Sequence, residues 1–220
     1  GRRRQRQMCI RDSYRAICSA NLPPKVPTIL RPQRHFDTLT YGGNSSTQTI
    51  TGLEFKPDLV WVKRRNGDNS HIWSDSVRGT TKYFVSHDQS AEGTNAAFLT
   101  AFVNGGFTSG NNGDMNGSDR TYAAWCWRAG GNSNTYNIDD VGYTSASAAG
   151  LDGGTINPTG ASVNTKAGFS IISYTGNGTA GATIAHGLGK KPAWILLKRR
   201  DSSDNFYVYH HLINRGSNPE

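Results

Sequence analysis

Residues 52–73 of this chain read GLEFKPDLVWVKRRNGDNSHIW, and 135 residues further on, residues 187–209 read GLGKKPAWILLKRRDSSDNFYVY. Both copies contain Gly-Leu, two residues, Lys-Pro, a short apolar run, Lys-Arg-Arg, and then Asn or Asp. The proline fixes the backbone just before the apolar run, which has the length and residue types of a central strand in a two-layer sandwich. A repeat of this length indicates a duplicated structural unit, and duplicated β-rich units are more typical of display scaffolds than of enzymes.

The remaining sequence predicts further strands and almost no helix. Short β-branched and aromatic runs alternate with turn residues, which is typical of a sandwich or a barrel. Strands are expected at Phe36–Tyr41, Leu59–Arg64, Ser70–Ser74, Lys82–Ser86, Gly106–Ser109, Thr121–Arg128, Phe169–Tyr174, Ala193–Arg199 and Asn205–Tyr209. The one helix candidate is Ala91–Phe102, which is rich in Ala. We therefore predict an all-β jelly-roll or concanavalin-like sandwich with an internal repeat, with Trp61 and Trp194 in its core.

Changes in composition divide the chain into four parts. Residues 1–34 form a basic tail that is expected to be disordered, and residues 35–130 form a first β unit. Residues 131–165 are a Gly/Ser/Asn-rich junction, and residues 166–220 form a second β unit. The first unit continues to Trp127, whereas the second stops at Glu220, so we expect the second unit to be truncated. One sandwich with pseudo-repetition is preferred over two separate domains.

The formal charge of +8 is confined to the tail. Residues 1–34 hold nine basic residues and one acidic residue, whereas residues 35–220 hold fifteen of each sign. A basic chain commonly binds nucleic acid, but a neutral body removes that expectation, and no nucleic-acid partner is predicted. The tail resembles the translation of a sequencing adapter. A natural disordered tail and a functional basic arm are the alternatives.

The body offers little material for a metal site, a cofactor or a membrane span. Cys126 is its single cysteine, so neither a disulfide nor a cysteine-based metal site is expected. The glycines of Gly176–Gly181 match a dinucleotide-binding spacing, but the glycines and proline that follow are incompatible with the helix that such a site needs. The longest apolar run has six residues, far short of a membrane span.

Acid–base catalysis is also not expected. Glu54, Asp58 and Asp75 are the candidates for a carboxylate pair of the kind that glycosidases use. In the second copy these positions hold Gly189, Ala193 and His210. The acids are therefore interpreted as ordinary surface carboxylates, and the chain as a non-enzyme.

Three segments carry a resemblance to a known family. They are TGLEFKPDLVWVKRRNGDNSHIWSDSVRG at residues 51–79, GGFTSG at residues 105–110 and YAAWCWRAGG at residues 122–131. These segments resemble an uncharacterised domain of marine bacteriophage structural proteins, and the resemblance covers Phe36 to Leu212. It implies a lectin-like sandwich on the virion, in the tail or at the particle surface, in contact with other virion proteins and with a host-surface glycan. A polysaccharide-degrading enzyme of the tail-spike type and a purely architectural module are the alternatives, and phage fibres suggest a homotrimer by analogy.

The candidate glycan site is the polar region around His71, Trp73, Asp75 and Arg78. A tryptophan ring offers a stacking face for a sugar, and the other three side chains offer directional hydrogen bonds. Asp75 and Arg78 have an alternative role, in which they pair with each other and brace the turn that ends at Gly79. No catalytic residue, metal ligand or cofactor is predicted.

Overall fold

The computed structural model describes residues 29–213, and almost every regular element in this range is a strand. The predicted all-β sandwich class is confirmed. The helical elements in the described range are one 3-10 turn, η2 (Pro32–Arg34), and one short α-helix, α2 (Gly113–Asn116). Neither has the length and apolarity that a membrane span would require.

The largest sheet has six strands, and each runs antiparallel to its neighbours. Its order is β1 (Phe36–Gly42), β9 (Thr121–Trp127), β3 (Leu59–Arg64), β4 (Ile72–Asp75), β5 (Lys82–Val85) and β6 (Gly93–Thr94). The strand β3 belongs to the first copy of the repeat. It lies between β9 and β4, so its prediction as a central strand is confirmed.

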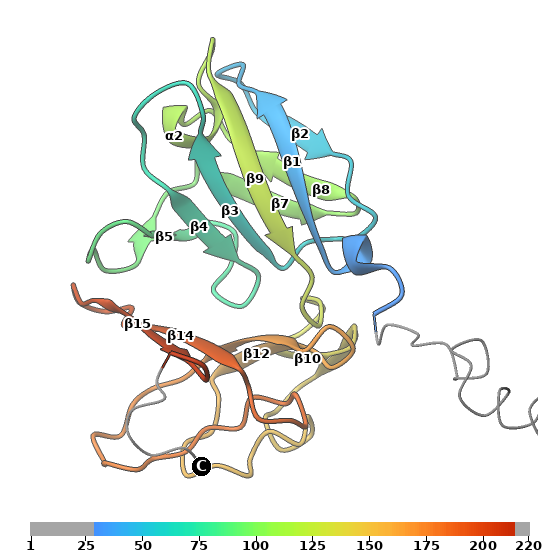
Figure 1. Ribbon diagram of the computed structural model, residues 1–220, viewed down its shortest axis with the longest axis vertical. Helices are drawn as coiled ribbons and strands as arrows, with labels where there is room; N and C mark the ends of the chain where they lie inside the picture. Colours follow the sequence, from blue (N-terminus) through green and yellow to red (C-terminus); the bar gives the residue numbers. More distant parts are fainter. Residues whose placement is uncertain (1–28, 214–220) are drawn as a thin grey trace, which may run out of the picture. The chain divides into compact units, whose positions relative to one another are not determined.

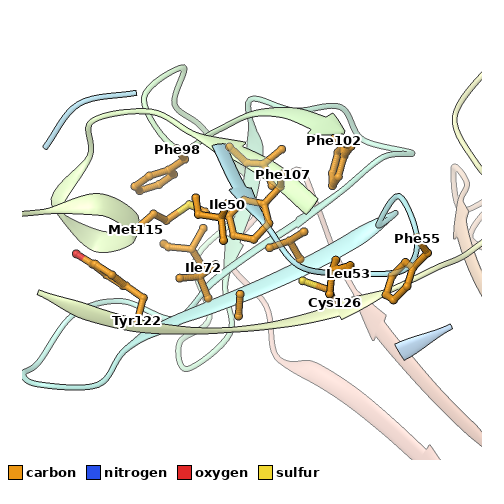
Figure 2. Packing of buried hydrophobic residues seen from close by; sticks show 14 residues of the cluster. Ile50, Leu53, Phe55, Ile72, Phe98, Phe102, Phe107, Met115, Tyr122 and Cys126 are labelled. Carbon is orange, nitrogen blue, oxygen red and sulfur yellow. The ribbon is translucent and has the colours of Figure 1, made fainter. Parts of the chain in front are cut away.

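A three-stranded antiparallel sheet forms the second layer of the sandwich, and in Figure 1 its strands β7 and β8 lie behind β9. Its strands in order are β2 (Gln48–Thr51), β8 (Gly106–Ser109) and β7 (Leu99–Val103). Apolar side chains from the two sheets form a core that includes Phe107, Ile72 and Tyr122 (Figure 2). Because side chains alternate along a strand, Val60 and Val62 of β3 point into this core and are completely buried.

The helix predicted over Ala91–Phe102 is wrong. This segment forms β6 and the start of β7, and β7 pairs with β8. Leu99 and Phe102 are buried in the core, whereas Thr100 between them is exposed. Pairing with β8 and burial of these two side chains therefore override the local preference of the alanines for helix.

Residues 131–165, predicted as a junction, hold three strands of a separate four-stranded sheet. Its order is β11 (Val141–Tyr143), β10 (Tyr136–Ile138), β12 (Gly160–Asn164) and β13 (Phe169–Ser173), with β10 and β12 parallel. A small core of Ala146, Ala149, Leu151, Ala161 and Val163 packs with this sheet. Small side chains thus form the core beside strands in a segment whose composition indicated loops. The division of the chain into four parts stays a prediction.

The second copy of the repeat forms a two-stranded sheet, β14 (Trp194–Lys198) and β15 (Phe206–His210). Its register is the register of β3 and β4 displaced by 135 residues: Leu59 pairs with Asp75, and Trp194 pairs with His210. The prediction that Trp194 lies in the core is wrong, since half of this residue is exposed. Within residues 29–213, no further sheet covers β14 as the three-stranded sheet covers β3.

Residues 1–28 of the predicted basic tail lie outside the described residues. The last part of that stretch folds against the body: Arg31 and Arg34 both form ion pairs with Glu54, at 3.0 and 3.1 Å. His35 then closes η2, with its backbone N–H donating to the carbonyl of Pro32.

Candidate functional site

The outer face of the six-stranded sheet carries a row of aromatic side chains, here called the aromatic row: Trp125, Trp61, Trp73 and Phe84. Each pairs directly with the next across neighbouring strands, β9, β3, β4 and β5. Directly opposed residues of antiparallel strands share one face of a sheet. The ring centroids of Trp61 lie 5.3 Å from Trp125 and 5.9 Å from Trp73. Four aromatic side chains, distant in sequence, therefore lie side by side.

The aromatic row lies on the side of the sheet opposite the core. The residues beside it on the inner face, Val62, Ile72 and Ala124, are completely buried. The three tryptophans are only partly buried, whereas Phe84 is 7% exposed. Phe206 of β15 lies against Trp73 and Phe84 at that end of the row. The prediction that Trp61 belongs to the core is wrong, because the sandwich covers one face of β3 and leaves the other to the row.

Polar groups border the aromatic row. The Trp61 indole Nε1 donates to Ser86 Oγ at 3.0 Å. The His71 and His87 rings lie 4.8 Å apart, and His87 is exposed. Burial lowers the pKa of His71, and the nearby charges of Lys63 and His87 lower it further. These side chains place hydrogen-bonding groups next to aromatic surface, and His71 favours its neutral form.

Asp75 and Arg78 form a buried ion pair and do not lie open to a ligand. Arg78 Nε lies 2.5 Å from Asp75 Oδ2, and the two side chains are 4% and 6% exposed. Arg78 also donates to the Trp73 carbonyl at 3.1 Å and lies over the Phe84 ring, 4.0 Å from its centroid. These contacts match the bracing role considered above, so the proposed site divides. Trp73 stays partly exposed on the outer face, whereas Asp75 on the same face and Arg78 over the Phe84 ring are both buried at that end of the row.

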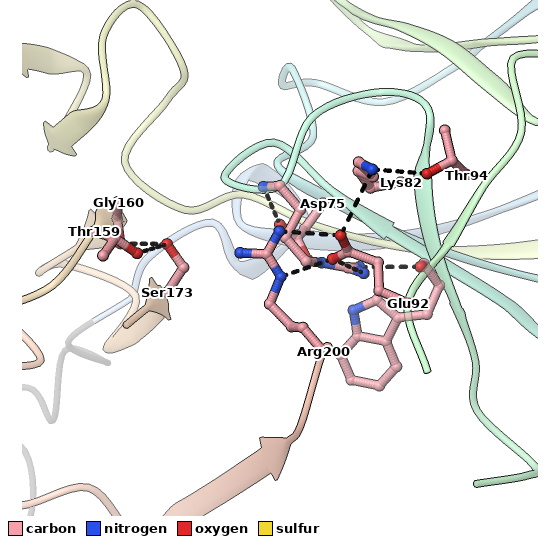
Figure 3. A network of polar contacts seen from close by, with 10 residues as sticks. Asp75, Lys82, Glu92, Thr94, Thr159, Gly160, Ser173 and Arg200 are labelled. Carbon is pink, nitrogen blue, oxygen red and sulfur yellow. Dashed lines mark hydrogen bonds and ion pairs between the residues drawn. The ribbon is translucent and has the colours of Figure 1, made fainter. Parts of the chain in front are cut away.

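The ion-pair network continues to the second copy of the repeat (Figure 3). Glu92 lies 3.5 Å from Arg78 and accepts two hydrogen bonds from Arg200, at 2.8 and 3.0 Å. The Glu92 backbone N–H also donates to the Arg200 carbonyl at 2.8 Å. Lys198 donates to the Gln89 carbonyl at 2.9 Å. The loop before β6 therefore holds the Lys-Arg-Arg turn of β14.

The three carboxylates considered for catalysis all have structural partners, and the interpretation of Asp58 and Asp75 as surface carboxylates is wrong, since both are buried. Glu54 pairs with two arginines and Asp75 with Arg78, as described above. Asp58 is buried and accepts hydrogen bonds from Ser76 Oγ at 2.9 Å and from the Ala129 and Gly131 backbone N–H groups at 2.8 and 3.2 Å. Burial raises the pKa of Asp58, although these hydrogen bonds act in the opposite direction.

Other chemistry is equally sparse in the described part of the chain. No group of three or more His, Cys, Asp or Glu residues within residues 29–213 has the geometry to hold a metal ion. Cys126 is completely buried in the core, and burial raises the pKa of its thiol to about 12, so the reactive thiolate is strongly disfavoured. Gly176–Gly181 lies in the loop between β13 and β14, with no helix after it.

A depression of about 460 Å³ lies away from the aromatic row, lined by residues that include Glu54, Lys56, Arg128 and Asp140. Its charges already have partners: Arg128 pairs with Asp140, and Lys56 donates to Asn132 Oδ1 at 2.7 Å. The aromatic row is therefore the better candidate for a binding surface.

The fold and this face define an all-β sandwich module with an aromatic outer sheet face. The chain belongs to the family described as Domain of unknown function (DUF7483), whose model matches residues 31–218. No curated protein and no solved structure shows significant similarity to the chain.

Proposed function

We propose that this chain is a non-enzymatic structural protein of a bacteriophage virion, associated with the tail, and that its aromatic row binds a host-surface glycan. Three partly exposed tryptophans are aligned across β9, β3 and β4, and this alignment is the observation that supports glycan binding. The virion context rests on the sequence resemblance described above.

The chemistry of the aromatic row suits a sugar chain. The C–H groups of a pyranose ring form an apolar face that packs on an indole ring, while its hydroxyl groups need hydrogen-bond partners at the edge of that ring. Ser86 Oγ accepts from the Trp61 indole, and His71, two residues before Trp73, lies against His87, so these side chains can supply such partners. An extended row on a sheet face fits consecutive sugars of a polysaccharide better than it fits a small molecule, which normally binds in a concave pocket.

The tail-spike enzyme has less support than the binding module. A glycosidase needs two carboxyl groups placed across the scissile bond. Glu54, Asp58 and Asp75 are each held by arginines or by backbone N–H groups. A purely architectural module is the remaining alternative, and it predicts that no glycan binds.

The test measures retention of the protein in native gels that contain host capsule or lipopolysaccharide. We expect Trp61→Ala and Trp125→Ala to weaken binding at least about tenfold, equivalent to ~1.4 kcal/mol. Trp194→Ala is the matched control, because it removes an exposed tryptophan outside the aromatic row, and it should bind as the parent does. Melting temperatures of all three variants show whether each remains folded.

Three outcomes would contradict the proposal. Folded Trp61 and Trp125 variants that bind as tightly as the parent would exclude the aromatic row as the site. A glycan array without any ligand would favour the architectural module. New reducing ends in the incubated polysaccharide would show that the protein is an enzyme.

A further inference from the structure

In the described part of the chain, the second copy of the repeat lacks the neighbours that complete the first. We propose that β14 binds an extended strand of a partner polypeptide along its free edge. This surface is separate from the aromatic row, and the inference does not depend on glycan binding. The two copies form the same hairpin in the same register, so the first copy shows what the second would accept.

In the first copy, β3 has a partner on both edges. β4 pairs with one edge and β9 with the other, where six consecutive residues, Leu59–Arg64, pair with β9. The three-stranded sheet then covers the inner face, and Val60 and Val62 are 1% and 0% exposed. Edge pairing and the covering layer together remove these side chains from water.

In the second copy, the equivalent side chains face solvent. Ile195 and Leu197 take the places of Val60 and Val62 and are 37% and 44% exposed. Tyr207, on the same face, is 55% exposed. Within residues 29–213, β15 is the one strand that pairs with β14. A two-stranded hairpin alone is marginally stable in water, and a free edge beside exposed apolar side chains is a template for a further strand.

The pairing of β3 with β9 specifies the chemistry of the occupant. Across that pairing, Val60 lies opposite Cys126 and Val62 opposite Ala124, whereas Trp61 lies opposite Trp125. An occupant of β14 should therefore run antiparallel to it. It should place small apolar residues opposite Ile195 and Leu197, and larger aromatic residues on the other face. Addition of a strand to a sheet edge combines affinity from backbone hydrogen bonds with specificity from alternate side chains.

Two other occupants fit less well. A sugar chain needs free polar partners, whereas on this face Ile195 and Leu197 are aliphatic and the Tyr207 hydroxyl already donates to Asp204 Oδ1 at 3.0 Å. A second copy of this chain could pair β14 with itself about a two-fold axis at Leu196, but this would set Ile195 opposite Leu197. Each of these large side chains needs a small residue opposite if the pairing follows that of β3.

The experiment uses the whole chain and a fluorescent peptide with the β9 sequence, TYAAWCW, flanked by two lysines at each end for solubility. Fluorescence anisotropy should show saturable binding with one peptide per chain. Ile195→Glu and Leu197→Glu should weaken binding at least about tenfold, since each places a charge on the proposed contact face. The control is Val208→Glu, which alters a more exposed residue on the other face of the hairpin, and it should change binding less than about threefold.

The outcome of each measurement supports or overturns the proposal. The same peptide with N-methyl groups on the amides that face β14 should not bind. Equal binding by the N-methylated peptide, or by both glutamate variants, would exclude strand addition at β14. Sedimentation of the unliganded chain as a dimer that Leu197→Glu dissociates would assign the surface to a second copy instead and overturn the proposal. Melting temperatures show whether each variant is folded.

Discussion

Replacing Arg78 by methionine tests whether this residue braces the sandwich or contacts a ligand. Methionine keeps much of the length of the side chain and removes the charge. The Asp75 carboxylate, which is 6% exposed, then loses an ion-pair partner at 2.5 Å and keeps the hydrogen bond from the Arg78 backbone N–H at 3.0 Å. The Trp73 carbonyl loses a donor as well. Removing one partner of a buried pair costs about 3–5 kcal/mol, and because one bond to Asp75 remains, we expect about 3 kcal/mol.

The matched control is Arg199→Met, which removes an arginine of similar local geometry from the surface. Arg199 Nε lies 2.7 Å from Asp201 Oδ1, but the two side chains are 55% and 78% exposed. Exposed ion pairs contribute little, so this variant should unfold at the same urea concentration as the parent. Adding Asp75→Asn to Arg78→Met should recover part of the loss, since it removes the buried unpaired charge.

The free energy of unfolding is measured by urea titration with tryptophan fluorescence as the signal. A loss below about 1 kcal/mol for Arg78→Met, with no gain from the added Asp75→Asn, would refute the bracing role. If that stable variant also lost glycan binding, Arg78 would instead be a ligand contact, as the candidate site first proposed from the sequence requires.

Two further predictions concern the sandwich itself. Gly106→Ala should lower the free energy of unfolding by at least about 2 kcal/mol, because the new Cβ would lie 1.8 Å from the Ile50 carbonyl oxygen of the paired strand β2. Gly153→Ala is its control, with no atom within 4 Å of the new Cβ, and equal thermal stability of the two variants would contradict the close pairing of β2 and β8. Because the folded pKa of Asp58 is raised, the folded chain holds this proton more tightly than the unfolded chain does. The stability of the parent relative to Asp58→Asn should therefore rise as the pH falls from 7 towards 3.8, and a fall over this range in urea titrations would show that the sign is wrong.

The sequence predicted those strands whose own residues favour extended structure. β1, β3, β9 and both strands of the second hairpin contain β-branched and aromatic residues between turn signals, and all were located. β2, β10, β11 and β12 were missed because each is short, with three to five residues, and is bordered by Gly, Asn, Ser and Asp, so that their few β-branched and aromatic residues form no recognisable run. Neighbouring strands supply the hydrogen bonds that order these segments, and this contribution is not visible in a local pattern.

The candidate site was predicted in part for a similar reason. His71 and Trp73 were located from their polar setting, and both border the outer face. Trp61 and Trp125 were missed because they lie in apolar runs that suggested the core. The alternation within each run was visible in the sequence: it places Val60 and Val62 on one face of the strand and Trp61 on the other. Which side faces water depends on the pairing of β3 with β9 and β4, and residues distant in sequence provide that pairing.

A comparison of the two hairpins distinguishes what local sequence contributes to their structure from what distant residues contribute. Their sequences share the proline, the apolar run and the Lys-Arg-Arg turn, and both adopt the same register, so these local features favour the same hairpin with and without a covering sheet. Burial differs completely: Val62 is 0% exposed, and its counterpart Leu197 is 44% exposed. Burial therefore comes from the neighbouring strands and the covering sheet. A hairpin that keeps its register without this burial retains the conformation that a new strand needs, so the binding of such a strand to β14 would not require the hairpin to refold.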